Sequence, residues 1–124
     1  MRKLSLMIFI VDDDRDFRDS LRFLLESEGW PSRGFATARE FLGSQMPVDG
    51  DILVTDMHMP GMSGLELLAT IRKSGLALPV VLMTGNSNSA LRSRALLQRA
   101  TAFLEKPFRS TDILPLIRQS NAVG

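Results

Sequence analysis

The sequence contains no cysteine, and it has only one histidine and one tryptophan among its 124 residues. Without cysteine the chain cannot form a disulfide bond, a thiolate metal site or a cysteine nucleophile, and this composition agrees with a reducing cytoplasmic environment. A charge excess is also missing, because 15 Lys and Arg residues face 14 Asp and Glu residues for a net charge of +1. Such a balance gives no electrostatic support for direct binding to nucleic acid.

Long apolar runs are missing as well. No stretch approaches the roughly 18 apolar residues that a membrane-spanning helix needs, so we expect no membrane partner. Arg2 and Lys3 precede the apolar residues 4–11 as in a secretory signal, but the run ends in acidic residues 12–14 without a small-residue cleavage site. There is no internal repeat or linker, and the 44% hydrophobic content predicts one globular domain over residues 1–124.

Apolar strand patterns and helical patterns alternate along the chain. The nearly unbroken apolar runs are typical of strands buried on both faces of a parallel sheet. We expect strands at residues 6–11, 32–35, 51–55, 78–84 and 101–105, and helices at residues 15–28, 38–42, 64–73, 89–98 and 111–119. This alternation predicts an α/β fold, a doubly wound, flavodoxin-like sheet of five parallel strands in the order 2-1-3-4-5 with five helices on its two faces.

Several residues mark the ends of the predicted helices. Ser63 and Glu66 form a capping-box pattern at the start of the helix at residues 64–73, and Gly75 stands where that helix should end. Gly29 stands at the end of the first helix in the same way. Pro115 lies near the start of the last helix, where beyond the first turn it costs about 3 kcal/mol. We therefore expect the last helix to be short or to start late.

Polar side chains follow the predicted strands at the points where they end. Asp12 and Asp13 follow the first strand, Asp56 the third, Thr84 the fourth and Lys106 the fifth. In the order 2-1-3-4-5 these four strands are neighbours, so the side chains should converge on one pocket at the carboxyl edge of the sheet. Carboxylate oxygens suit Mg²⁺, which also relieves the repulsion between adjacent acidic residues.

The remaining acidic residues of the first cluster have a simpler interpretation. Asp14 and Asp16 stand at the start of the first predicted helix, where carboxylates cap the backbone and are favoured by the helix dipole. An EF-hand calcium loop would use Asp12, Asp14 and Asp16 as ligands. That loop is excluded, because Phe17 occupies the position of its glycine and Phe23 that of its glutamate.

Four motifs together resemble the receiver domains of two-component response regulators, which have the CheY-like fold. They are "VDDD" at residues 11–14, "LVTDMHMPGMSGLELL" at 53–68, "VVLMTG" at 80–85 and "FLEKPF" at 103–108, and the resemblance covers essentially the whole chain. The variants "TDMHMPGMSG", "MTG" and "EKPF" are most similar to receivers linked to LuxR-type helix-turn-helix output domains. The resemblance therefore implies a role in transcription regulation, either as a stand-alone receiver or as part of a longer regulator.

The resemblance implies a phosphoacceptor with a metal site. Asp56 would accept a phosphoryl group from a sensor histidine kinase, in a reaction that depends on Mg²⁺, with Mn²⁺ as a substitute. Asp13 and Asp56 would bind the metal directly through their carboxylates, and His58 would bind it through its backbone carbonyl. Asp12 would be an acidic partner of these ligands that does not itself bind the metal. The chain would be a signalling protein rather than a metabolic enzyme, catalysing its own phosphorylation and, later, hydrolysis of the acyl phosphate.

The resemblance also implies a conformational switch. Thr84 and Lys106 would contact the phosphoryl group, and Phe103 would be the aromatic partner that turns inward. His58 and Asn86 would line the path of the hydrolytic water. Phosphorylation would promote a homodimer through the fourth helix and fifth strand, and three arginines there could supply charged contacts: Arg92, Arg94 and Arg99.

Two other classes of protein share part of this pattern. A haloacid-dehalogenase-like phosphohydrolase would begin with the Asp-x-Asp of "DDDRD" and use Thr84 and Lys106 in its later motifs, but only Asp112 remains to form its downstream acidic pair. A flavodoxin-like cofactor-binding module needs a phosphate-cradling loop after the first strand, where three carboxylates would repel the cofactor. The phosphohydrolase is the stronger alternative.

One turn departs from the usual receiver pattern. Receivers often have an Ala-Gly pair before the fifth strand, and this chain has Gln98 and Arg99 there. This difference concerns the geometry of the turn and not the chemistry of the acidic site.

Overall fold

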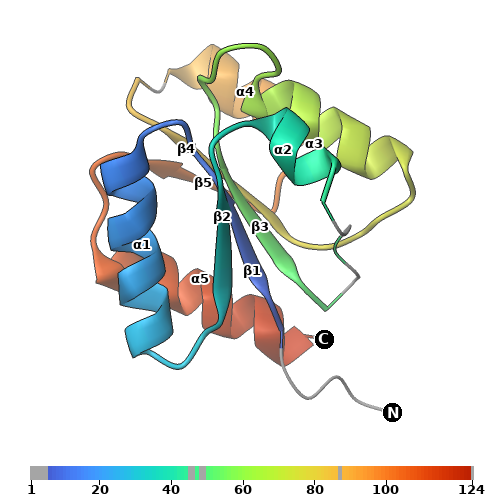
Figure 1. Ribbon diagram of the computed structural model, residues 1–124. Coiled ribbons are helices and arrows are strands. Elements are labelled where there is room, and N and C mark those ends of the chain that lie inside the picture. Colours follow the sequence, from blue (N-terminus) through green and yellow to red (C-terminus); the bar gives the residue numbers. More distant parts are fainter. Residues whose placement is uncertain (1–5, 45–46, 48–49, 87, 124) are drawn as a thin grey trace.

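The computed structural model describes residues 6–44, 47, 50–86 and 88–123, with side chains up to residue 120; Arg2 and Lys3 lie outside this part. In the described residues, strands and helices alternate (Figure 1). The strands are β1 (Ile8–Val11), β2 (Ser32–Phe35), β3 (Ile52–Asp56), β4 (Val80–Thr84) and β5 (Ala102–Glu105). The helices are α1 (Arg15–Ser27), α2 (Ala38–Leu42), α3 (Gly64–Lys73), α4 (Ser89–Leu97) and α5 (Ser110–Val123).

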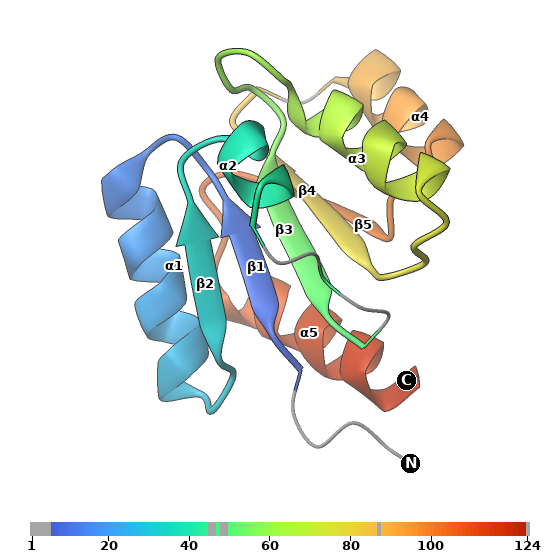
Figure 2. The same cartoon turned by 45° about the vertical axis from the view of Figure 1, so that its right-hand side comes forward.

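The five strands form one parallel sheet in the order β2-β1-β3-β4-β5, which confirms the predicted topology. Helices α1 and α5 cover one face of this sheet, and α2, α3 and α4 cover the other (Figure 2). Because all strands run in the same direction, their carboxyl ends lie at one edge, where β1, β3, β4 and β5 are consecutive neighbours. No helix in the described part of the chain is both long enough and apolar enough to cross a bilayer.

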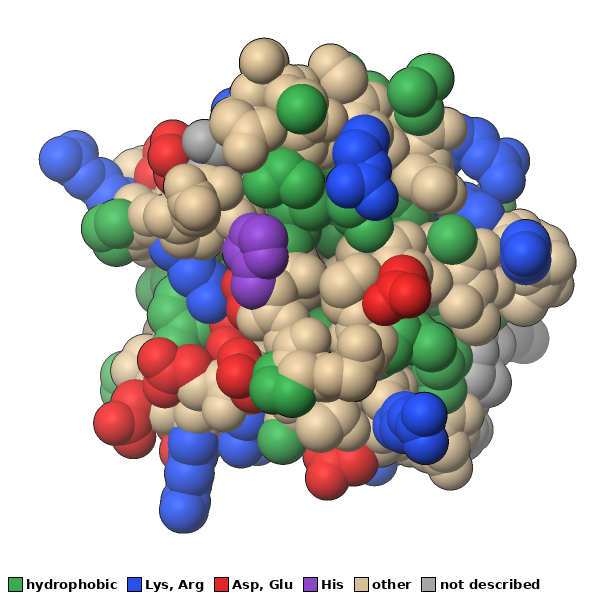
Figure 3. Space-filling view, turned by 90° about the horizontal axis from the view of Figure 1, so that it is seen from above, with side chains coloured by type: hydrophobic (Ala, Val, Ile, Leu, Met, Phe, Trp, Pro, Cys, Tyr) green, Lys and Arg blue, Asp and Glu red, His purple; other side chains and the backbone are tan. Residues whose placement is uncertain are grey.

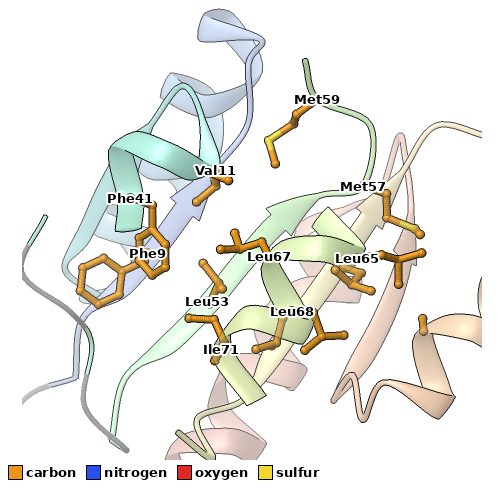
Figure 4. Close-up of a cluster of buried hydrophobic side chains, with 14 of the residues drawn as sticks. Phe9, Val11, Phe41, Leu53, Met57, Met59, Leu65, Leu67, Leu68 and Ile71 are labelled. Carbon is orange, nitrogen blue, oxygen red and sulfur yellow. The ribbon is translucent and has the colours of Figure 1, made fainter. Parts of the chain in front are cut away.

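The central strands are buried on both faces, which explains their unbroken apolar sequences. In β1, Phe9 and Val11 face the core under α2, α3 and α4, whereas Ile8 and Ile10 face the core under α1 and α5. Figure 4 shows the first of these cores, where the rings of Phe9 and Phe41 pack with their centroids 5.5 Å apart. Successive residues of β1 therefore point to opposite faces of the sheet, as in any strand, although the residues on both faces are apolar.

The helix ends follow the predicted caps. The side chain of Asp14 accepts a hydrogen bond from the backbone N–H of Phe17, so this carboxylate caps α1 as predicted. At α3 the reciprocal bonds of the capping box between Ser63 and Glu66 are both present, at 2.9 and 3.2 Å. Gly29 and Gly75 have φ angles of 90° and 88°, which a residue with a side chain rarely adopts, and each follows its helix directly after the cap residue.

The prediction for the last helix was wrong. Helix α5 begins at Ser110 and continues through Pro115 to Val123 instead of being short or late. Ile113 and Ile117 of this helix are completely buried while Pro115 is exposed, so apolar packing on the inner face offsets the one backbone donor that proline lacks. The other predicted bounds lie close to those observed.

The unusual turn before β5 adopts a left-handed backbone conformation. Arg99 has a φ angle of 66°, in the region where glycine is favoured. This conformation costs a residue with a side chain about 1 kcal/mol. The guanidinium of Arg72 offsets part of that cost by donating a hydrogen bond of 2.9 Å to the carbonyl oxygen of Arg99 and another of 2.7 Å to that of Leu78. Gln98 and Arg99 thus form the turn without glycine.

Candidate functional site

Three carboxylates meet at the carboxyl edge of the sheet, as the strand order predicts. One oxygen atom from each of Asp12, Asp13 and Asp56 lies within 4.8 Å of the others. Asp12 and Asp56 are buried and Asp13 is exposed, so the cluster opens to solvent on one side. Figure 3, which views the molecule from this edge, shows acidic side chains gathered beside the histidine.

Lys106 joins this cluster from the end of β5. Its Nζ atom lies 2.7 Å from Oδ2 of Asp12 and 3.3 Å from Oδ1 of Asp56. Burial by itself lowers the pKa of the Lys106 ammonium, but the hydrogen bonds and charges of Asp12 and Asp56 outweigh burial and raise the pKa above its usual value. Lys106 is therefore a permanent cation in contact with both buried carboxylates.

The carboxyl group of Asp56 is held in an unfavourable environment for a negative charge. Burial raises its pKa, attraction to Lys106 lowers it, and repulsion from Asp12 and Asp13 raises it further, with a net increase. Three carboxylates against one ammonium leave two negative charges uncompensated when all four groups are ionised. One divalent cation would neutralise these two negative charges.

The donor set of the cluster fits Mg²⁺. All three groups offer carboxylate oxygens, the ligands that this ion prefers, and none of the three offers nitrogen or sulfur. Mg²⁺ usually retains several water molecules and binds only one or two carboxylates directly. The exposed position of Asp13 leaves room for such waters, and the uncompensated charge matches that of the ion.

The backbone around Asp56 is fixed by tight packing between β3 and α3. The N–H group of Met57 donates to the carbonyl oxygen of Met83 at 2.8 Å, and that of Gly64 donates to the carbonyl oxygen of Met57 at 3.0 Å. A Cβ atom at Gly64 would collide with the carbonyl oxygen of Asp56 and lie 2.9 Å from the Cα atom of Met57. Only glycine allows α3 to begin this close to the acidic residue.

Thr84 is completely buried at the end of β4, and its hydroxyl already has two partners. Its Oγ1 atom accepts a hydrogen bond of 3.1 Å from the backbone N–H of Asn86 and lies 3.1 Å from Nε2 of His58. The sequence did not predict the contact of the His58 side chain. The only signal was position, because His58 stands two residues beyond Asp56 and Asn86 two residues beyond Thr84.

Phe103 lies apart from the carboxylates, on the face of the sheet under α4. Its ring is partly buried against the apolar core, and the guanidinium carbon of Arg92 lies 5.0 Å from the ring centroid. In the sheet, Phe103 pairs with Leu82, two residues before Thr84. Thr84 and Phe103 thus lie on adjacent strands, offset by two positions in the register, and the guanidinium of Arg92 lies over the ring of Phe103.

Comparisons with known proteins agree with this geometry. The family model of the response regulator receiver domain matches residues 8–118. The transcriptional regulatory protein FixJ of Azorhizobium caulinodans is 41% identical over 116 residues, which cover 94% of this chain and 55% of that protein. The chain thus spans about half the length of the curated relatives it matches.

Solved structures give the same result. The crystal structure of FixJ-N superimposes with a TM-score of 0.82 at 30% identity, covering 98% of this chain and 96% of the other. A response regulator receiver protein from Pseudoalteromonas atlantica superimposes with a TM-score of 0.86 at 31% identity, covering 95% and 99%. These matches give no support to the phosphohydrolase alternative.

Proposed function

This chain belongs to the response regulator receiver family, whose function is phosphoacceptor signalling, and we propose that Asp56 is its phosphoacceptor and that the reaction requires Mg²⁺. The observation that supports this assignment is the meeting of Asp56 with Lys106 and two further carboxylates at neighbouring strand ends. Asp56 is the carboxylate that β3 carries into the centre of this cluster, and it lies beside the Lys106 ammonium.

In the proposed reaction, a carboxylate oxygen of Asp56 attacks the phosphorus atom of a phosphohistidine on a sensor histidine kinase. The phosphorus–nitrogen bond breaks, its electron pair returns to the imidazole nitrogen, and Asp56 becomes an acyl phosphate. Lys106 stabilises the charge on the transferred oxygens, which is the main requirement of phosphoryl transfer. Asp13, Asp56 and the backbone carbonyl of His58 would hold Mg²⁺, with Asp12 as an outer partner. The ion supplies positive charge to the same oxygens.

Intact-mass analysis tests this proposal. Incubation with acetyl phosphate and Mg²⁺ should add one phosphoryl group to the wild-type protein, and EDTA should prevent the addition. Mn²⁺ should replace Mg²⁺ because it prefers the same oxygen ligands. If Asp56→Asn released inorganic phosphate from acetyl phosphate as fast as wild type, the protein would instead be a hydrolase with no receiver chemistry at Asp56.

The phosphoryl group would signal through Thr84 and Phe103. An oxygen of the phosphoryl group accepts a hydrogen bond from the hydroxyl of Thr84, and His58 then keeps its contact with Thr84 only as the donor, through Nε2–H. The end of β4 moves inward and opens the space into which Phe103 turns, releasing Arg92 from its ring. One charge-assisted hydrogen bond of this kind contributes about 1.5–3 kcal/mol, which shifts a two-state population by roughly tenfold or more.

We expect this change to promote a homodimer through α4 and β5. Leu96 and Leu97 of α4 are 65% and 84% exposed, and the arginines at positions 92 and 94 are exposed beside them. Apolar side chains with a charged rim suit a surface that a second copy covers. Such a dimer would carry the signal to a transcriptional output.

Hydrogen exchange and light scattering with beryllofluoride in place of the phosphoryl group should detect both events. We expect altered exchange at residues 84–106 and a shift from monomer to dimer, both absent in Thr84→Val, which keeps the side-chain shape but has no hydroxyl. Changes confined to α1 would contradict the switch. A monomer in both states would remove the dimer and leave the phosphorylation chemistry intact.

A further inference from the structure

The ammonium of Lys106 has an aromatic neighbour in addition to its two carboxylates. Its Nζ atom lies over the ring of Phe17, 4.1 Å from the centroid. A ring attracts a cation within about 6 Å of its centroid because the π electrons make its face negative. The Lys106 side chain is only 20% exposed, so water weakens this attraction less than it would on an open surface.

The ring of Phe17 is itself held in place. Phe108 meets it edge to face, with centroids 5.8 Å apart and planes at 87°. Both rings pack against the apolar core under α1 and α5. Phe17 belongs to the first turn of α1, directly after the acidic residues, and Phe108 follows Lys106 by two residues. The aromatic pair therefore links the two chain segments that carry Asp12 and Lys106.

We propose that Phe17 is a positioning residue that holds the Lys106 ammonium where it meets the phosphoryl group. This inference rests on the proposed function, because it takes Lys106 to contact the transferred oxygens. Asp56 changes from a carboxylate to an acyl phosphate during the reaction, so its contact with Lys106 changes as well. The negative electrostatic potential at the face of the Phe17 ring does not change during the reaction, and the ring restrains a lysine side chain that is otherwise long and flexible.

A purely structural role of Phe17 would have a different signature. Packing in the apolar core depends on the size and shape of the ring, whereas positioning of Lys106 depends on the negative electrostatic potential of the ring face. Fluorine atoms on the ring edge withdraw electrons from the face and leave the shape nearly unchanged. Fluorination therefore separates the two roles.

The experiment measures the initial rate of phosphoryl incorporation from acetyl phosphate at saturating Mg²⁺. Site-specific replacement of Phe17 by monofluoro-, difluoro- and trifluorophenylalanine should slow the reaction progressively, by roughly three- to tenfold for the trifluoro ring. The melting temperature should fall by no more than a few degrees, and the Mg²⁺ affinity should stay unchanged. Phe17→Leu should be slow as well, and Phe17→Tyr, which keeps an electron-rich ring, should approach the wild-type rate.

Phe23 provides the matched control, because it lies on the same helix and is 77% exposed. The same fluorinated residues at Phe23 should leave the rate unchanged. If Lys106→Met is slow and the trifluoro variant of Phe17 is as fast as wild type, the positioning role is wrong and the proposed function stands. If Lys106→Met is as fast as wild type, the role proposed for Lys106 fails, and the inference about Phe17 fails with it.

Discussion

Replacement of Asp56 by asparagine should abolish phosphoryl incorporation from acetyl phosphate. The substitution keeps the size of the side chain and its place at the end of β3, but an amide oxygen is a far weaker nucleophile than a carboxylate. Asp12 is also buried beside Lys106, but Asp56 stands at the end of β3, the middle strand of the sheet. Intact-mass analysis should therefore show the unmodified mass at all reaction times, with a rate at least about a thousandfold below wild type.

The thermal stability of the same variant provides the control for folding. Because the pKa of Asp56 is raised in the folded protein, this group contributes most to the stability of wild type below its unfolded-state pKa, and that contribution is lost as the pH rises through the folded-state pKa. The asparagine side chain does not titrate. In the absence of metal, the variant should therefore melt at or above the wild-type temperature at neutral pH, and the difference should shrink as the pH falls.

The outcome in a second variant separates the receiver from its alternative. A haloacid-dehalogenase-like phosphohydrolase would use Asp12 as its nucleophile. If Asp56→Asn were still phosphorylated and Asp12→Asn were not, the assignment of Asp56 would be wrong. Asp12 is instead expected to act as an outer partner, since its two oxygens already accept hydrogen bonds from the backbone of Asp14 and from Lys106.

The strand ends of this chain could be predicted because they depend on patterns within short segments. Apolar runs located the central strands, and the order of a doubly wound sheet then placed Asp12, Asp56, Thr84 and Lys106 at one edge. Parallel strands impose this convergence whatever the side chains do. The acidic cluster was therefore predictable from the sequence to the level of which residues meet.

Contacts that depend on side-chain direction were not predictable in this way. Phe17 and Lys106 are far apart in sequence, and nothing in the pattern of α1 distinguishes a ring that meets a cation from one that only fills the core. The contact between His58 and Thr84 has the same origin, since it depends on how one loop turns. Pro115 shows the converse case, in which a strong local signal was outweighed by tertiary packing.

Mg²⁺ binding should separate the metal ligands from the residues that meet only the phosphoryl group. Asp13→Asn removes a negative charge and a preferred oxygen ligand from the exposed side of the cluster, where the ion would enter. Outer-sphere changes at metal sites already cost roughly 10- to 100-fold in affinity, so if Asp13 is a direct ligand as proposed, its loss should weaken Mg²⁺ binding by at least about tenfold. Isothermal titration calorimetry of the unphosphorylated protein measures this affinity directly.

Lys106→Met is the matched variant for this measurement, because it leaves the backbone contacts in place and removes only the ammonium. The site then carries three carboxylates without a competing cation from Lys106, so Mg²⁺ should bind at least as tightly as in wild type. Phosphorylation of this variant should nevertheless be slow, because it lacks the ammonium that we propose stabilises the transferred oxygens. Equal losses of Mg²⁺ affinity in Asp13→Asn and Lys106→Met would show that Lys106 supports the metal site itself, and the proposed division of roles between the two residues would be wrong.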